Sequence, residues 1–273
     1  AVTGNIGLVF TASRNTTIRS SLSSGFRAPN IDDLAKIFES NSTARQVVVP
    51  NADIKPEYTY NMDISVSQRL FKKLNVELTG FYTLFRNGLV KAPYRLNGKD
   101  SILYNGVLCQ VLSTQNSNSA YLYGFTAGVN TDNIHGFMFS STVSYSYGRF
   151  KTDDSQLSSV YEKQPNGEYL LVKRYVSSKP LDHNPPLISR SAISYTHRRF
   201  STELWCMYNG WKHLDDFNAD GEDNAQYATP DGMPAWFTLN WKGSVNIIPS
   251  RQVQLGVENI LDRNYRAFAS GFS

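Results

Sequence analysis

The sequence has 273 residues and a formal net charge of +4, from 27 Lys and Arg against 23 Asp and Glu. The basic residues are dispersed, so they form no electrostatic footprint for nucleic acid. There is no apolar run of 18 residues, which excludes a membrane-spanning helix. The abundance of Tyr (16), Phe (15) and Trp (4) indicates an all-β protein with a large aromatic content.

Alternation of apolar and polar residues recurs about ten times along the chain. In EYTYNMDISVSQRL, residues 57–70, every even position up to Val66 is apolar and every odd position is polar. This period of two predicts a strand about twice as long as a usual soluble strand. The predicted strands are 2–11, 17–27, 57–70, 75–85, 121–131, 137–148, 188–195, 202–208, 237–247 and 253–258. We expect no signal peptide, because Ala1 should lie inside the first strand.

The connections between these strands alternate between short and long. The long ones are 28–56, 86–120, 149–187 and 209–236. In an up-and-down meander, all four would lie at the same end of the sheet. Structureless loops of this length are rare in soluble domains, whereas transmembrane β-barrels combine tight periplasmic turns with long extracellular loops. The pattern therefore favours an antiparallel transmembrane barrel over a soluble β-sandwich.

In such a barrel the apolar side of each strand faces lipid and the polar side faces a wet lumen. Backbone groups in lipid must be paired within a closed sheet. Charged residues predicted to line the lumen are Arg19, Glu57, Asp63, Arg69, Glu77, Lys242 and Glu258. Aromatic residues near strand ends are expected to form the girdles at the membrane surfaces. These are Tyr58, Tyr60, Tyr82, Tyr145, Tyr147, Tyr208 and Trp236.

Three stretches carry a resemblance to a known family. They are SSGFRAPNIDDL at 23–34, VPNADIKPEYTYNMDI at 49–64 and LGVENILDRNYRAFASGF at 255–272. In this order they resemble the barrel of TonB-dependent outer-membrane receptors, although the middle box, Asn51 to Ile54, lacks the usual proline. The tract ADGEDNAQYATPDGMPAW at 219–236 is similar to tracts of Bacteroidetes receptors.

The resemblance implies a 22-stranded barrel in the outer membrane of a Gram-negative bacterium. Residues 1–273 would form a partial β-barrel domain from the C-terminal part, without the plug domain, the first strands and the last strand. The family imports large scarce nutrients actively, which implies several partners for this chain. These are membrane lipid, its own plug domain, the TonB complex, a nutrient ligand and a surface lipoprotein.

A ferric siderophore or a similar nutrient is the substrate that the resemblance favours. Haem is not favoured, because no His lies between Pro29 and Pro50, where haem-importing relatives carry an axial ligand. We expect no resident cofactor. Candidate contacts with substrate or plug are Arg27, Arg69, Glu77, His183 and His213.

Stand-alone barrels offer the alternative: a passive channel, an adhesin or a protease. His213 precedes Asp215 and Asp216 in one long connection, and a His–Asp pair can activate water. Three neighbours in one loop rarely hold catalytic geometry, and no Gly-x-Ser-x-Gly, zincin or P-loop motif is present. Cys109 and Cys206 have no metal-ligand spacing and are expected to be free thiols. We therefore expect that the chain is not an enzyme.

The stretch DFNADGEDNAQY at 216–227 matches the first half of a calcium-binding loop. Asp216, Asn218 and Asp220 alternate and Gly221 follows, but Tyr227 stands where a bidentate Glu belongs. The alternative is an acidic hairpin whose Asp and Asn side chains stabilise turns. We expect weak calcium binding at most. The segment IDDLAKIF at 31–38 has apolar residues at helical spacing and predicts a short helix.

Overall fold

The computed structural model describes residues 2–30, 39–41, 45–116, 119–152, 154–155, 157–219 and 225–266. The short helix expected at 31–38 lies outside these residues. Within them, no helix is long and apolar enough to cross a membrane.

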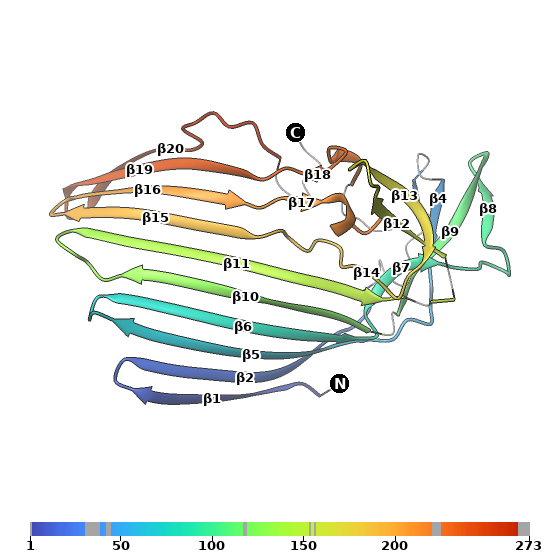
Figure 1. Ribbon diagram of the computed structural model, residues 1–273, viewed down its shortest axis with the longest axis horizontal. Coiled ribbons are helices and arrows are strands. Elements are labelled where there is room, and N and C mark those ends of the chain that lie inside the picture. The colour runs from blue at the N-terminus through green and yellow to red at the C-terminus, as the bar shows by residue number, and fades with distance from the viewer. Residues whose placement is uncertain are drawn as a thin grey trace.

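Ten long strands run side by side in one antiparallel sheet, and their order in the sheet is their order in the chain (Figure 1). They are β1 (Gly4–Ser13), β2 (Thr16–Arg27), β5 (Glu57–Leu70), β6 (Leu74–Arg86), β10 (Ser119–Thr131), β11 (Phe137–Lys151), β15 (Ile188–His197), β16 (Phe200–Asn209), β19 (Trp236–Ile248) and β20 (Arg251–Val257). This arrangement confirms the predicted meander and each of its strands to within a few residues.

Five short turns join these strands at one end of the sheet, and the four long connections gather at the other end (Figure 1). The short turns need backbone conformations with positive φ. In the turn after β10, His135 has a φ of 53° and Gly136 a φ of 94°. A Cβ on Gly136 would come within 2.7 Å of the Thr196 carbonyl oxygen, so only glycine fits there. The predicted alternation of short and long connections is confirmed.

Pairing across the sheet gives each strand one polar and one apolar side. Residues that are paired in the ladder share a face, so the alternation along one strand continues across its neighbours. We call the two sides the polar face and the apolar face. Polar-face members include Arg19, Ser21, Asp63, Ser65, Glu77, Thr79, Thr126, Thr142, Arg190, Glu203, Asn240, Lys242 and Ser244.

The apolar face exposes large hydrophobic side chains along all ten strands. Ile6, Leu22, Ile64, Leu78, Phe125, Phe139, Ile193, Leu204, Val245 and Val257 are each at least 37% exposed. Six of the seven residues predicted for the aromatic girdles share the parity of this face. The seventh assignment is wrong: Trp236 pairs with Asn209 on the polar side and stacks on Tyr265 with ring centroids 4.1 Å apart.

Shorter strands lie within the long connections, which are therefore not structureless. These strands are β3 (Glu39–Asn41), β4 (Gln46–Val49), β7 (Leu89–Pro93), β8 (Ser101–Tyr104), β9 (Val107–Asn116), β12 (Leu157–Lys163), β13 (Tyr169–Tyr175), β14 (Ser178–Pro180), β17 (Lys212–His213) and β18 (Gly232–Met233). Two 3-10 turns, η1 (Leu214–Asp216) and η2 (Ala225–Tyr227), are the only helical elements among the described residues.

Candidate functional site

The polar face of β2, β5 and β6 is a continuous hydrogen-bonded surface. Ser21 Oγ donates to Asp63 Oδ1 at 2.6 Å, and Ser65 Oγ donates to Glu77 Oε1 at 2.9 Å. Thr79 Oγ1 donates in turn to Ser65 Oγ at 3.0 Å. Each carboxylate accepts a hydrogen bond from a hydroxyl group of a neighbouring strand. These bonds stabilise the negative charges on the polar face, which is compatible with a wet lumen.

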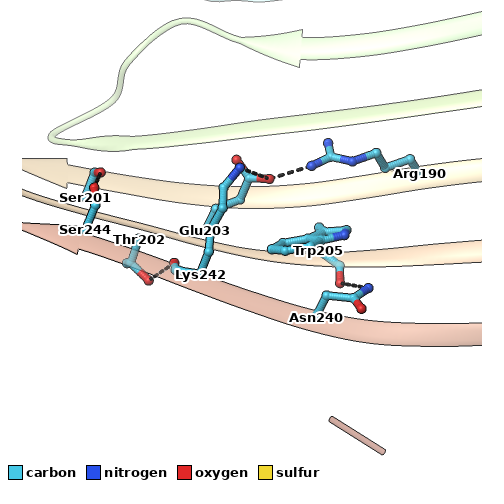
Figure 2. Close-up of polar contacts among 8 residues, drawn as sticks. All are labelled: Arg190, Ser201, Thr202, Glu203, Trp205, Asn240, Lys242 and Ser244. Atoms are coloured by element: carbon cyan, nitrogen blue, oxygen red, sulfur yellow. Dashed lines mark hydrogen bonds and ion pairs between the residues drawn. The ribbon is translucent and has the colours of Figure 1, made fainter. Parts of the chain in front are cut away.

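A second polar-face group lies where β15, β16 and β19 run together. Figure 2 shows the Glu203 carboxylate between the Arg190 guanidinium and the Lys242 ammonium. Arg190 Nη2 lies 2.5 Å and Lys242 Nζ 3.6 Å from the same oxygen, Glu203 Oε1. The ring of Trp205 lies beneath both cations, 5.8 Å from Arg190 Cζ and 5.4 Å from Lys242 Nζ. We call these four residues the cation cluster.

The first two long connections fold together at the rim of the sheet. β4 from 28–56 pairs in parallel with β9 from 87–118, and β7 and β8 extend the same small sheet. Val47, Val49, Cys109 and Val111 form its core, and each is at most 2% exposed. Because the core takes residues from both connections, these loops form one folded unit.

The last two long connections make a second unit. The β12–β13 hairpin from 152–187 supplies Tyr161 and Tyr169, which pack on the buried side chains of Leu214, Phe217 and Met233 from 210–235. Figure 1 shows both units beyond the same end of the sheet. The described parts of all four connections thus contribute to folded units.

A break in the wall lies beneath the second unit. β15 begins only opposite Ser144 of β11, so the upper part of β11 lacks its neighbour, and β14 and residues 181–187 occupy that place. Leu181 N–H donates to the Gly148 carbonyl at 3.0 Å. The Asn184 amide accepts from Ser146 Oγ at 2.8 Å and donates to the Ser146 carbonyl at 3.1 Å. This segment therefore continues the wall partly through side-chain bonds.

A cavity of about 280 Å³ lies at this break. Aromatic rings from the apolar side, Tyr145, Tyr147 and Tyr208, meet charged groups from the loops, Lys212 and Asp216. Lys212 is buried, and its Nζ donates to the Asn184 carbonyl at 2.9 Å. The cavity is at the lower limit of the size range of ligand pockets, so it is too small to enclose a large nutrient.

One carboxyl group beside this cavity, that of Asp216, has a raised pKa. Desolvation by the packed loops, followed by repulsion from the Asp215 carboxylate, raises the pKa of Asp216. Nearby Lys212 and His213 oppose this shift without cancelling it. Asp216 is nevertheless an exposed residue, so the loops desolvate its carboxylate only in part. Burial and hydrogen bonding to Asp215 also raise the pKa of Tyr169.

The five predicted contact residues do not converge. Arg27 ends β2 on the polar face beside the loops, and Glu77 lies on the polar face of β6 toward the short turns. Arg69 lies at the short-turn end, where its guanidinium forms an ion pair with Asp132 and Nε donates to the Lys72 carbonyl at 2.9 Å. His183 lies in the wall break with a φ of 58°, and His213 stacks on Trp211 at 5.6 Å.

The calcium pattern is only partly described by the structure. Asp216 ends η1, Asn218 is buried, and Asp220 lies outside the described residues. Among the described residues, no group of three or more His, Cys, Asp or Glu side chains could hold a metal ion. Cys109 is buried in the first loop unit, and both cysteines are free thiols.

The cation cluster was missed by sequence reasoning, which placed only Lys242 on the lumen side. Its signal was nonetheless present: Arg190, Glu203 and Trp205 each stand at a polar-side position of their own predicted strand. The alternation predicts the face of the sheet on which each residue lies. It does not predict the strand register that brings residues of β15, β16 and β19 into contact.

A family model identifies the family of this sheet. The model, described as "TonB dependent receptor-like, beta-barrel", matches residues 1–260. The chain belongs to this family. Barrels of the family are outer-membrane proteins, and the polar and apolar faces of this receptor wall have the composition expected for a lumen and a lipid surface. A search of curated protein sequences found no match to this chain.

Solved structures share the fold of this receptor wall at low sequence identity. The ferric enterobactin receptor PfeA of Pseudomonas aeruginosa is 14% identical with a TM-score of 0.68 over 99% of this chain and 36% of its own. The siderophore receptor PirA of Acinetobacter baumannii is 15% identical with a TM-score of 0.64, covering 96% and 37%. The copper transporter OprC is 15% identical with a TM-score of 0.65, covering 98% and 34%. The chain spans about a third of the length of these structures.

Proposed function

We propose that this chain forms part of the barrel wall and several external loops of a receptor that imports a ferric siderophore, or a similarly large and scarce nutrient, across the outer membrane of a Gram-negative bacterium. The observation that carries the proposal is the gathering of all four long connections, as two folded units, at one end of a wall with a polar face. That arrangement offers a broad binding surface above a hydrated path.

The structural neighbours support this choice of nutrient, because two of those named are siderophore receptors. Another neighbour is a copper transporter, so a different metal-containing substrate is also compatible with this fold. All three are transporters or receptors, which favours transport over the enzymatic alternative. In the proposed mechanism the loops bind the nutrient, and TonB supplies the energy that admits it to the lumen.

The partners of the whole receptor belong to this proposal. A plug domain would fill the lumen against the polar face, and lipid would cover the apolar face. A surface lipoprotein that caps the loop units, a Bacteroidetes origin and a C-terminal position of this chain in the barrel follow from the sequence resemblance. Arg27, which is closest to the loop end on the polar face, is the proposed contact to substrate or plug among the predicted residues.

Uptake by a deletion strain tests the function. Cells that lack the gene are expected to lose accumulation of ⁵⁵Fe supplied as ferric siderophores, and the full-length gene restores it. A strain without TonB is expected to show the same loss even when the gene is present. Growth on defined iron and cofactor sources then identifies the nutrient. Unchanged uptake and growth of the deletion strain on every tested source would exclude this function.

A further inference from the structure

The charged residues on the apolar face are all basic. Among the residues of the ten long strands, the carboxylates lie on the polar face: Glu57, Asp63, Glu77 and Glu203. At the ends of β6 and β11 toward the long connections, three basic residues have the parity of the apolar face: Arg86, Arg149 and Lys151. No acidic residue of a long strand balances this positive charge on the same face.

Both arginines lie at the depth where lipid headgroups begin. Gly80 is the middle residue of β6, and Arg86 ends the strand six residues later. Six residues rise about 15 Å along the normal of a membrane, whereas the apolar band of a barrel extends about 12 Å from its middle. Arg149 lies two residues closer to the middle, but its guanidinium group reaches outward to Ser178 of β14. The two guanidinium groups are therefore at the level of the headgroups.

Neither arginine has a carboxylate partner among the described residues. Arg86 is exposed and forms no hydrogen bond or ion pair within the part of the chain that the structure describes. Arg149 Nε donates to Ser178 Oγ at 3.0 Å, its Nη2 to the Ser178 carbonyl at 3.1 Å and its Nη1 to the Tyr147 hydroxyl at 3.3 Å. These acceptors are neutral, so they hold the guanidinium group in place without neutralising its charge. Two of its five N–H groups remain open to a ligand.

Tyrosine rings occupy the face between the two arginines. β10 runs between β6 and β11 (Figure 1), and the rings of its Tyr121 and Tyr123 stack with centroids 6.3 Å apart. Tyr123 also lies 5.4 Å from Tyr147 of β11. Such rings are typical of the interface between membrane and water. From the strand spacing and the offset of two residues in register, the backbones of Arg86 and Arg149 are about 12 Å apart. Two long side chains can reach one headgroup from either side of that gap.

We propose that Arg86 and Arg149, which we call the rim arginines, bind the anionic phosphate of a lipid headgroup at the surface of the membrane on the side of the long connections. The planar guanidinium group binds phosphate through two parallel hydrogen bonds, which favours phosphate over other negative groups. The acyl chains of the lipid would lie against the apolar face below, and they would hold the phosphate beside the cations. A dissolved phosphate lacks this attachment. The inference rests on the proposed function for the membrane and adds a lipid preference to it.

Native mass spectrometry of the full-length receptor in a neutral detergent tests the proposal. The receptor is mixed with equal amounts of phosphatidic acid and of phosphatidylcholine, whose choline group neutralises the phosphate, both with the same acyl chains. Together the rim arginines should give the wild type about a 25-fold preference for phosphatidic acid, and Arg86→Gln or Arg149→Gln should each reduce it about fivefold. Arg86→Gln breaks no contact within the described residues, so its effect reports binding rather than folding. Arg19→Gln, on the polar face, is the matched control and should leave the preference unchanged.

Equal retention of the two lipids by the wild type would overturn the inference, and so would a preference that survives when both rim arginines are changed to Gln. Millimolar inorganic phosphate should not displace the bound lipid, and complete displacement would reject a membrane lipid as the ligand. ⁵⁵Fe uptake by cells that carry the same variants keeps the two claims apart. Uptake without a lipid preference rejects the lipid site alone, and a lipid preference without TonB-dependent uptake rejects the proposed function alone.

Discussion

Two glycines on neighbouring strands test which face of the wall contacts lipid. Gly80 of β6 lies on the apolar face opposite Ile64, and Gly128 of β10 lies on the polar face opposite Glu77. A Cβ built on either residue meets nothing within 4 Å. Lysine therefore fits both positions without steric cost, and the two variants differ mainly in the medium that receives the ammonium group.

The expected magnitude follows from the depth of Gly80. It is the seventh of the 13 residues of β6. Six residues on each side span about 20 Å of strand, or about 15 Å along the membrane normal at the usual tilt, so Gly80 lies near the middle of the apolar band. A lysine there costs about 2–4 kcal/mol, a change of about 30- to 1,000-fold in the folding equilibrium.

Equilibrium unfolding by guanidinium of the full-length receptor in lipid vesicles measures this cost. Gly80→Lys should lose about 2–4 kcal/mol, and Gly128→Lys should change by less than about 0.5 kcal/mol because its ammonium group lies on the polar face beside Glu77. Gly80→Leu should be at least as stable as the wild type, since lipid accepts its side chain. Equal losses for the two lysine variants would refute the membrane assignment of the faces.

Three further predictions concern the loops. Val111→Ala should destabilise the first loop unit by about 2 kcal/mol and expose both of its connections to protease together, while Leu108→Ala, which alters an exposed side chain, should not. The raised pKa of Asp216 means that its charged form opposes loop folding. This cost is absent below pH 3.8, the ordinary pKa of the group, and appears as pH rises through the raised pKa. Asp216→Asn should therefore slow hydrogen exchange of the loop at pH 7 but not at pH 3.5. Millimolar Ca²⁺ should slow proteolysis within 214–227, and Asp220→Asn should weaken that effect; no change in cleavage with Ca²⁺ would exclude the site.

Alternation predicted the wall well because each strand has one wet and one apolar side. The stretch 57–70 was predicted to the residue, as β5 shows. The loop units were not predicted. Val47 to Val49 form an apolar run without alternation, and their partner β9 lies some 60 residues away in another connection. Only the folded chain shows that this run is the core of a small sheet rather than part of an irregular loop.

Register limited the prediction of the site in the same way. Lys242 could be placed on the polar side from its own strand, but its contact with Glu203 depends on the pairing of β16 with β19 across a connection of 26 residues. The girdle prediction for Trp236 was wrong for a related reason. Trp236 lies at a strand end among aromatic residues, but it has the same parity as Asn240 and therefore lies on the polar face, where it stacks on Tyr265.

The wall break at residues 181–187 sets a boundary for exchanging loops between receptors. Asn184 donates to the Ser146 carbonyl, as an adjoining strand would, and also accepts from Ser146 Oγ, while Leu181 fills the space left by Gly148. A graft that replaced everything between β11 and β15 would remove this seal and leave the Ser146 carbonyl without its donor at the rim of the sheet. The exchangeable part of this connection therefore ends at Ser177, before β14 and well before the start of the next long strand.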